Sequence, residues 1–275
     1  MRKLSAEYPV WFCDIWGVIH NGYEPFANTV ACLAKHREQG GVVVLVSNSP
    51  RSETGIIKQL DEIGVTRAAY DAAVTSGDVT RTLMEEAPSH KLFHLGPERD
   101  DSIFHGVHVE RVPLDQASAV ICTGLFHDTH ETPADYETLL KEILSRKLPM
   151  ICANPDKMVR KGSRLLYCAG SLAERYAAMG GEVSMAGKPY APIYDLARGK
   201  AEAARGKHVE QGDILAIGDG PETDIKGAAD QGIACLYVTG GVREHVEDME
   251  SELAHIRELV PSARIVAAVP ELVWS

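Results

Sequence analysis

The sequence has no long hydrophobic run and no apolar leader at its start. A membrane helix needs roughly 20 consecutive apolar residues, and no uncharged run of this chain approaches that length. The first residues, 1–7, carry charges where a secretion signal has its apolar core. We therefore expect no membrane association and a cytoplasmic location.

The sequence also lacks basic blocks and paired cysteines. Its formal net charge is −11 at pH 7 and its lysines and arginines are not clustered, so an extended phosphate backbone would be repelled. The six cysteines stand singly without a C-x-x-C motif, most of them within apolar runs, which is typical of buried, reduced thiols. Nucleic acid is therefore not an expected partner, and the compartment is expected to be reducing.

What the sequence does contain is an alternation of short β-branched runs with helical patterns, near both ends of the chain. Such an alternation is typical of parallel βαβ winding. It predicts one doubly wound parallel sheet to which both ends of the chain contribute. The expected strands are residues 10–13, 42–46, 72–75, 214–217 and 234–238, and the expected helices are residues 26–39, 52–63, 192–204 and 223–231.

The middle of the chain has a set of strands and helices of its own. A stretch of roughly a hundred residues is long enough for an independent domain, and the 275 residues suffice for two domains. We predict a core of residues 1–78 and 185–275, with residues 79–184 inserted as a second α/β domain. The strands expected there are residues 92–95, 107–109, 119–122, 150–153 and 165–168, and the helices are residues 136–146 and 172–179.

Polar residues follow two of the predicted core strands near the start of the chain. Asp14 ends an apolar run and is followed by Gly17, which places it where open α/β sheets bind ligands. Its carboxylate suits a nucleophile or a metal ligand, although a cap of the following turn is an equal alternative. Ser47 and Asn48 end the next run just before a helix. Their hydroxyl, amide and backbone N–H groups suit phosphate oxygens, although both residue types are also ordinary helix caps.

Two further clusters stand in the last third of the chain. Lys188 precedes a predicted helix, where an ammonium group can neutralise both a carboxylate and a phosphoryl group. Asp219 and Asp224 lie in a glycine-rich loop, and hard carboxylate oxygens suit Mg²⁺. A dinucleotide-binding loop is excluded, because Thr223 takes the place of the third glycine of that fingerprint.

In this order the four clusters resemble the motifs of the haloacid dehalogenase-like (HAD) hydrolases, specifically their NagD-like class IIA branch. The resemblance covers nearly the whole chain and implies a doubly wound parallel-sheet (Rossmann-like) core with an inserted α/β cap that sets substrate specificity. The matching segments are Asp14-Ile15-Trp16-Gly17-Val18, Ser47-Asn48, Lys188, and Gly218-Asp219-Gly220-Pro221-Glu222-Thr223-Asp224, together with Asn154-Pro155-Asp156, which looks like the N-P-D segment of the caps of that branch.

The resemblance also implies an activity, namely Mg²⁺-dependent hydrolysis of a small phosphorylated metabolite. Asp14 would attack phosphorus to give an aspartyl-phosphate that water then hydrolyses. We allow for a homodimer. The implied metal ligands are Asp14, Asp219, the backbone carbonyl of Trp16 and, in support, Asp224, whereas the implied phosphate- or substrate-binding residues are Ser47, Asn48, Lys188, Asn154 and Asp156.

Trp16 departs from the family pattern. The usual first motif is D-x-D, and its second aspartate protonates the leaving oxygen, a contribution worth roughly 10²–10⁴-fold. Three explanations stay open: a substrate with a good leaving group, a proton from another side chain such as His20, His127 or Asp156, or a protein that binds or senses a phosphorylated ligand with little or no turnover. Dehalogenation is disfavoured, because two more carboxylates near an anionic nucleophile make sense chiefly around a cation.

Overall fold

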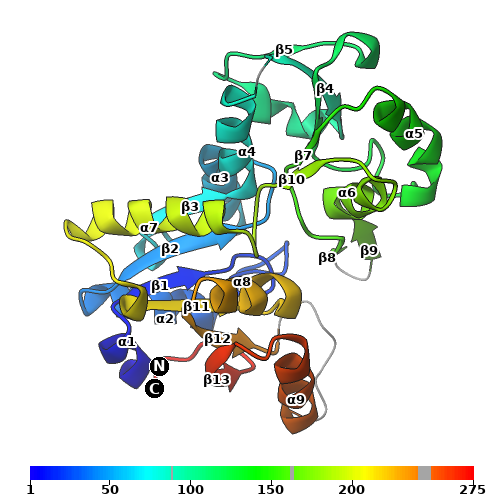
Figure 1. Cartoon of the computed structure of the whole chain (residues 1–275). Helices are drawn as coiled ribbons and strands as arrows, with labels where there is room; N and C mark the ends of the chain where they lie inside the picture. Colours follow the sequence, from blue (N-terminus) through cyan, green and yellow to red (C-terminus); the bar gives the residue numbers. More distant parts are fainter. Residues whose placement is uncertain (88, 162–163, 241–248) are drawn as a thin grey trace. The chain divides into compact units, whose positions relative to one another are not determined.

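Two separate parallel sheets organise the chain in the computed structural model, which describes residues 1–87, 89–161, 164–240 and 249–275 (Figure 1). Each sheet belongs to one compact unit. The first unit comprises Met1–Ser47, Gly55–Val74 and Lys188–Ser275, and the second comprises Asn48–Thr54 and Thr75–Gly187. The predicted fold class, a parallel core sheet with a second parallel sheet inserted into the chain, is confirmed.

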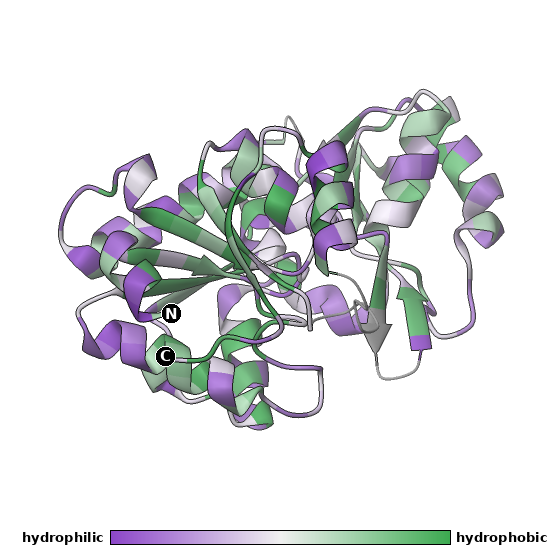
Figure 2. Ribbon diagram, turned by 90° about the horizontal axis from the view of Figure 1, so that it is seen from below, coloured by the Kyte–Doolittle hydropathy of each residue, from purple (hydrophilic) through white to green (hydrophobic). Residues whose placement is uncertain are grey.

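The first unit is built on a six-stranded sheet in the order β13-β12-β11-β1-β2-β3. Its central strands are hydrophobic throughout, as expected of parallel strands that are covered on both faces, and Figure 2 shows them mostly in the green of hydrophobic residues. Trp11, Leu45 and Leu236 are fully buried among them. The strands are β1 (Val10–Cys13), β2 (Val42–Ser47), β3 (Ala72–Thr75), β11 (Ile214–Gly218), β12 (Ala234–Val238) and β13 (Arg264–Val269).

The helices that accompany this sheet range from five to fifteen residues in length. The longest ends at Gly206, whose φ of 69° is a left-handed conformation that glycine adopts without strain. The helices are α1 (Arg2–Glu7), α2 (Ala27–Glu38), α3 (Glu53–Ile63), α7 (Ala191–Arg205), α8 (Lys226–Asp230) and α9 (Met249–Leu259). None of the helices in the described part of the chain combines the length and hydrophobicity that a membrane crossing requires.

The second unit is built on a five-stranded sheet in the order β10-β7-β6-β4-β5, with an antiparallel hairpin of β8 and β9 as a separate element. Leu140 and Leu172 pack with Cys122 in its core. The strands are β4 (Lys91–Leu95), β5 (Glu110–Arg111), β6 (Ala119–Cys122), β7 (Met150–Cys152), β8 (Met158–Lys161), β9 (Arg164–Tyr167) and β10 (Val183–Met185), and the helices are α4 (Ser76–Glu85), α5 (Glu137–Ser145) and α6 (Ala169–Ala178).

One of the predicted elements is wrong, and the α-helical part of another is shorter than predicted. Residues 107–109 are not a strand, because the chain pairs with β4 only from Glu110 onward; the apolar Val107 is buried as part of a connecting segment. The helix predicted over residues 223–231 is a π-helical turn, η6 (Pro221–Ile225), followed by the short α8. The six cysteines are all buried and unpaired, as predicted.

Candidate active site

The register of the parallel strands brings distant parts of the sequence to one edge of the first unit's sheet. β1 lies between β11 and β2, and Cys13 pairs with both Ile217 and Leu45. Asp14 continues this register, since its N–H donates to the carbonyl of Ile217 at 2.8 Å. The residues that directly follow the ends of β1 and β11, and the last residue of β2, therefore gather where parallel sheets bind their ligands.

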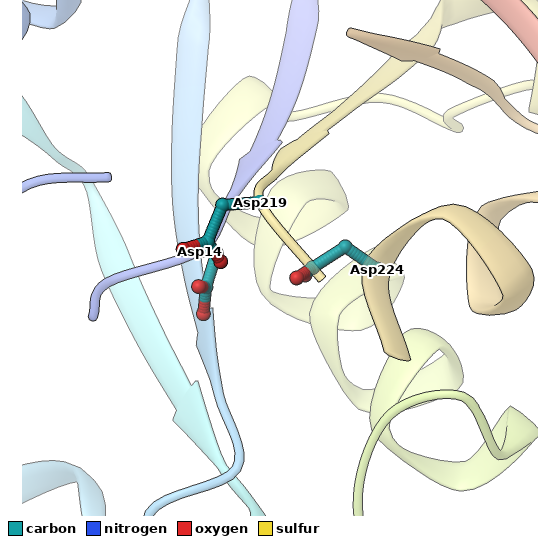
Figure 3. A group of neighbouring side chains, drawn as sticks. All are labelled: Asp14, Asp219 and Asp224. Atoms are coloured by element: carbon teal, nitrogen blue, oxygen red, sulfur yellow. The ribbon is translucent and has the colours of Figure 1, made fainter. Parts of the chain in front are cut away.

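Three carboxylates meet at this edge. Asp14, Asp219 and Asp224 each offer an oxygen within 4.8 Å of the others, and no other group of three potential metal-ligating side chains is found among the described residues. Figure 3 shows the three gathered at the strand ends, with Asp224 approaching from the start of the following helix. Asp14 and Asp224 are buried, and Asp219 is half-buried.

The glycines of the fourth cluster make room for Asp224. A Cβ atom at Gly218 would lie 2.1 Å from Cγ of Asp224, so only glycine allows this approach. The N–H of Gly220 donates to Oδ2 of Asp224 at 3.1 Å, and the N–H of Asp224 donates to the carbonyl of Gly220 at 2.8 Å. The glycine-rich loop is thus shaped around a carboxylate. This role of Gly218 was missed in the sequence, although the spacing of the glycines was visible there.

Lys188 joins two of the three carboxylates. Its Nζ lies 2.5 Å from Oδ1 of Asp14 and 2.7 Å from Oδ1 of Asp224, and the lysine is only 4% exposed. Burial lowers the pKa of Lys188, but Asp14 and Asp224 outweigh this and raise it well above its usual range. Burial, with the charges of Asp224 and Asp219 added and Lys188 opposing, holds the pKa of Asp14 well above normal.

The charges of this group fit a divalent cation. The group contains three carboxylates and one ammonium group in a largely buried site, so negative groups outnumber positive ones among these four residues, and buried charge is costly unless it is balanced. The donors are hard oxygens, which Mg²⁺ prefers. A divalent ion would cancel the excess and favour the ionised form of Asp14.

The remaining predicted residues divide between the two units. Ser47 is the last residue of β2 in the first unit and is buried. Asn48, Asn154 and Asp156 belong to the second unit, where Nδ2 of Asn48 donates to Oδ1 of Asp156 at 2.9 Å and the N–H of Asp156 donates to Oδ1 of Asn154 at 3.0 Å. The structure therefore brings together Asp14, Lys188, Asp219 and Asp224 in one group, and Asn48, Asn154 and Asp156 in another.

Two family patterns match this chain. The family described as haloacid dehalogenase-like hydrolase matches residues 11–110, and one described as HAD-hydrolase-like matches residues 185–264. A solved structure of a hydrolase of the haloacid dehalogenase-like family from Brucella suis 1330 is 45% identical and covers 99% of this chain and 98% of its own, with a TM-score of 0.89. The chain belongs to the haloacid dehalogenase-like family of hydrolases. The resemblance to its NagD-like class IIA branch is confirmed as well.

More distant members of this HAD family have known activities. A D-glycerol 3-phosphate phosphatase of Mycobacterium tuberculosis is 24% identical over 290 residues, which are 100% of this chain and 77% of the relative. A crystal structure of glycerol phosphate phosphatase from the same organism, in complex with magnesium, is 23% identical and covers 98% of this chain and 76% of its own, with a TM-score of 0.69. At 23% identity, the similarity to this crystal structure shows a shared fold.

Trp16, where the HAD pattern has a second aspartate, packs on the turn that follows it. Its ring meets the ring of His20 edge-to-face at 5.3 Å, and a Cβ atom at Gly22 would lie 2.5 Å from its Cη2. Because it has no Cβ atom, Gly22 leaves room for the indole ring of Trp16. Sequence reasoning missed this role. The φ of 94° at Gly22 marks the turn, and a glycine within a short polar segment was the only signal of it in the sequence.

Of the two histidines proposed as alternative proton donors, His20 does not suit that role. His20 is 1% exposed and its Nδ1 accepts a hydrogen bond from the N–H of Gly22 at 3.0 Å. Burial lowers the pKa of His20 to about 4, so the ring is neutral at neutral pH. His127 is exposed in the second unit and stacks on His130. His20 thus supports the turn beneath Trp16.

Proposed function

We propose that this protein is a Mg²⁺-dependent phosphatase of small phosphorylated metabolites, with Asp14 as the nucleophile. The observation that carries the proposal is the buried contact of Asp14 with Lys188 within the group of three carboxylates. A nucleophile for an anionic phosphoryl group needs positive charge beside it, which Lys188 supplies and a cation held by the carboxylates would increase. The phosphatase activities of the relatives support the same reaction class.

The reaction proceeds by two displacements at phosphorus. The Asp14 carboxylate attacks phosphorus, the bond to the ester oxygen breaks, and the leaving oxygen takes up a proton. Water then attacks the aspartyl-phosphate, which releases inorganic phosphate and restores the carboxylate. Lys188 and Ser47 hold the transferring oxygens, so that binding positions phosphorus in line with the nucleophile. Asn48, Asn154 and Asp156 stay predicted phosphate or substrate contacts.

Mg²⁺ is the cation that this site would hold. Its ligands would be Asp14, Asp219 and the backbone carbonyl of Trp16, with Asp224 in support. When bound, the ion neutralises the phosphoryl oxygens and so reduces their repulsion of the attacking carboxylate. Lys188, held between Asp14 and Asp224, supplies a further positive charge on the side of the nucleophile.

Specificity is assigned to the second unit. In this proposal the second unit acts as the cap of a HAD hydrolase, and its loops select the metabolite. Loops suit this role because they vary more between related proteins than the scaffold that carries them. A homodimer stays a prediction. The rival function is a sensor that binds a phosphorylated ligand without turnover, and the observation that favours it is Trp16, whose indole cannot act as a general acid.

A phosphatase screen with Mg²⁺ over aryl, alkyl and acyl phosphates tests the proposal. We expect the wild-type protein to release inorganic phosphate from at least one class, and Asp14→Asn to lose this activity. Asp115→Asn, which changes an exposed acid of the second unit, is the matched control and should retain it. Turnover that survives Asp14→Asn would exclude Asp14 as the nucleophile. Tight binding without turnover of any phosphate would favour the sensor.

A further inference from the structure

The side chain of Asn48 is hydrogen-bonded through its amide nitrogen, and its amide oxygen lies close to Gly187. The residue is 5% exposed. Its Nδ2 donates to Oδ1 of Asp156 at 2.9 Å, and on its other side a Cβ atom at Gly187 would lie 2.4 Å from its Oδ1. An amide fixed in this way, between two segments far apart in the sequence, acts as a structural link within the second unit.

Asp156 is itself firmly anchored. Its N–H donates to Oδ1 of Asn154 at 3.0 Å, and its carbonyl accepts from the N–H of Gly170 at 3.1 Å, at the start of α6. A Cβ atom at Gly170 would lie 2.6 Å from the carbonyl oxygen of Asp156. The backbone of the N-P-D segment is therefore packed directly on a helix, which gives its carboxylate a defined position.

The segment of residues 48–54, which includes the first two residues of α3, is also bound to the start of α4. The N–H of Gly77 donates to the carbonyl of Ser49 at 3.1 Å, and the N–H of Glu53 donates to Oδ1 of Asp78 at 3.0 Å. Asp78 is fixed in turn by a capping box with Thr75. These bonds explain why the segment belongs to the second unit, although it begins directly after Ser47.

We infer that Asp156 is a positioning residue, which holds Asn48 and thereby sets the main chain directly after Ser47. The Oδ1 atom of the same amide lies close to Gly187, which directly precedes Lys188 in the chain. The two residues proposed to hold the phosphoryl oxygens, Ser47 and Lys188, are thus each one peptide bond away from this link. The inference rests on the proposed function. It gives Asn48 and Asp156 a role in addition to their predicted contact with the substrate.

The geometry suggests a pair of variants at Asp156. Asp156→Ala removes the acceptor, and we expect kcat for a phosphate ester to fall by about 10- to 100-fold, with a smaller change in KM, because misplacing a catalytic loop chiefly affects the transition state. Asp156→Asn keeps an acceptor oxygen and should recover most of the rate. Asp135→Ala is the control, since Asp135 caps a turn at Thr132 in the same unit and should leave kcat unchanged.

An exchange of the two side chains gives the sharper test. Asn48→Asp alone sets two carboxylates at hydrogen-bonding distance and should lower kcat, because like charges repel. Adding Asp156→Asn restores one donor and one acceptor with their direction reversed, and should raise kcat again. Two independent substrate contacts would instead give losses that multiply. Binding of inorganic phosphate with Mg²⁺, measured in the same variants, should follow kcat.

The outcomes separate this inference from the proposed function. Wild-type protein without turnover contradicts the proposed function. If the wild type is active and Asp14→Asn is not, then an unchanged kcat in Asp156→Ala overturns the positioning role alone. An exchanged pair no more active than Asn48→Asp also overturns it, provided that unfolding by circular dichroism shows both proteins folded.

Discussion

At the scale of single residues, Trp16 decides what kind of phosphate ester this site can cleave. Its indole packs on His20 and Gly22, and the pKa of His20 is lowered to about 4 by burial. Neither ring can protonate a leaving oxygen at neutral pH. The leaving group must therefore be one that departs without being protonated, unless a side chain of the second unit donates the proton.

This reasoning predicts a strong dependence on the leaving group. We expect aryl phosphates such as 4-nitrophenyl phosphate to be hydrolysed faster than alkyl phosphates by about 10²–10⁴-fold in kcat/KM, the size of a lost general acid. Trp16→Asp should narrow this gap by accelerating the alkyl esters. Trp16→Asn loses the same ring without gaining an acid and is the matched control. Equal rates for aryl and alkyl esters in the wild type would show that a proton is supplied elsewhere.

At the scale of elements, the pairing of parallel strands brings the residues of the site together, and Gly218 leaves room for Asp224 among them. β1 pairs with both β2 and β11, and the turn after β11 folds back so closely that Asp224 lies against Gly218. The π-helical turn η6 follows from this approach, since the N–H groups of both Asp224 and Ile225 reach the carbonyl of Gly220. The site therefore depends on one backbone position that carries no functional group.

Gly218→Ala tests that dependence. The added methyl group would lie 2.1 Å from Cγ of Asp224, so the carboxylate must move away from Lys188. We expect kcat/KM to fall by about 100-fold and the free energy of unfolding to fall by about 1–3 kcal/mol. Gly212→Ala serves as the control, because a Cβ atom there meets nothing within 4 Å. Comparable activity of the two variants would contradict the close-approach argument.

The same elements show what the sequence could predict and why. β1, β6 and β12 are continuous buried apolar runs, and their boundaries follow from local pattern alone. The short α1 and β10 and the largely exposed α9, in which only Ile256 is fully buried, carry too little periodic signal and were not predicted. The hydrogen bond of Asn48 to Asp156 joins residues 108 positions apart, and only tertiary folding reveals it.

At the scale of the whole molecule, an acidic chain also brings carboxylates together in its interior. The formal net charge is −11, and the group of three carboxylates contains a single lysine, Lys188. Repulsion among these carboxylates opposes folding of the first unit. A bound divalent cation would remove this repulsion, so that binding of the ion would raise the free energy of unfolding.

We therefore predict that Mg²⁺ stabilises the wild-type protein against heat or urea. At a concentration of 100 times its dissociation constant the ion should add about 2.7 kcal/mol to the free energy of unfolding. Asp219→Asn removes one of the proposed ligands of the ion, so this variant should gain much less stability from Mg²⁺ than the wild type does. Asp115→Asn should respond to Mg²⁺ as the wild type does, because Asp115 lies on the surface of the second unit. Calorimetric unfolding with and without EDTA measures both effects, and an equal gain in Asp219→Asn and the wild type would place the cation elsewhere.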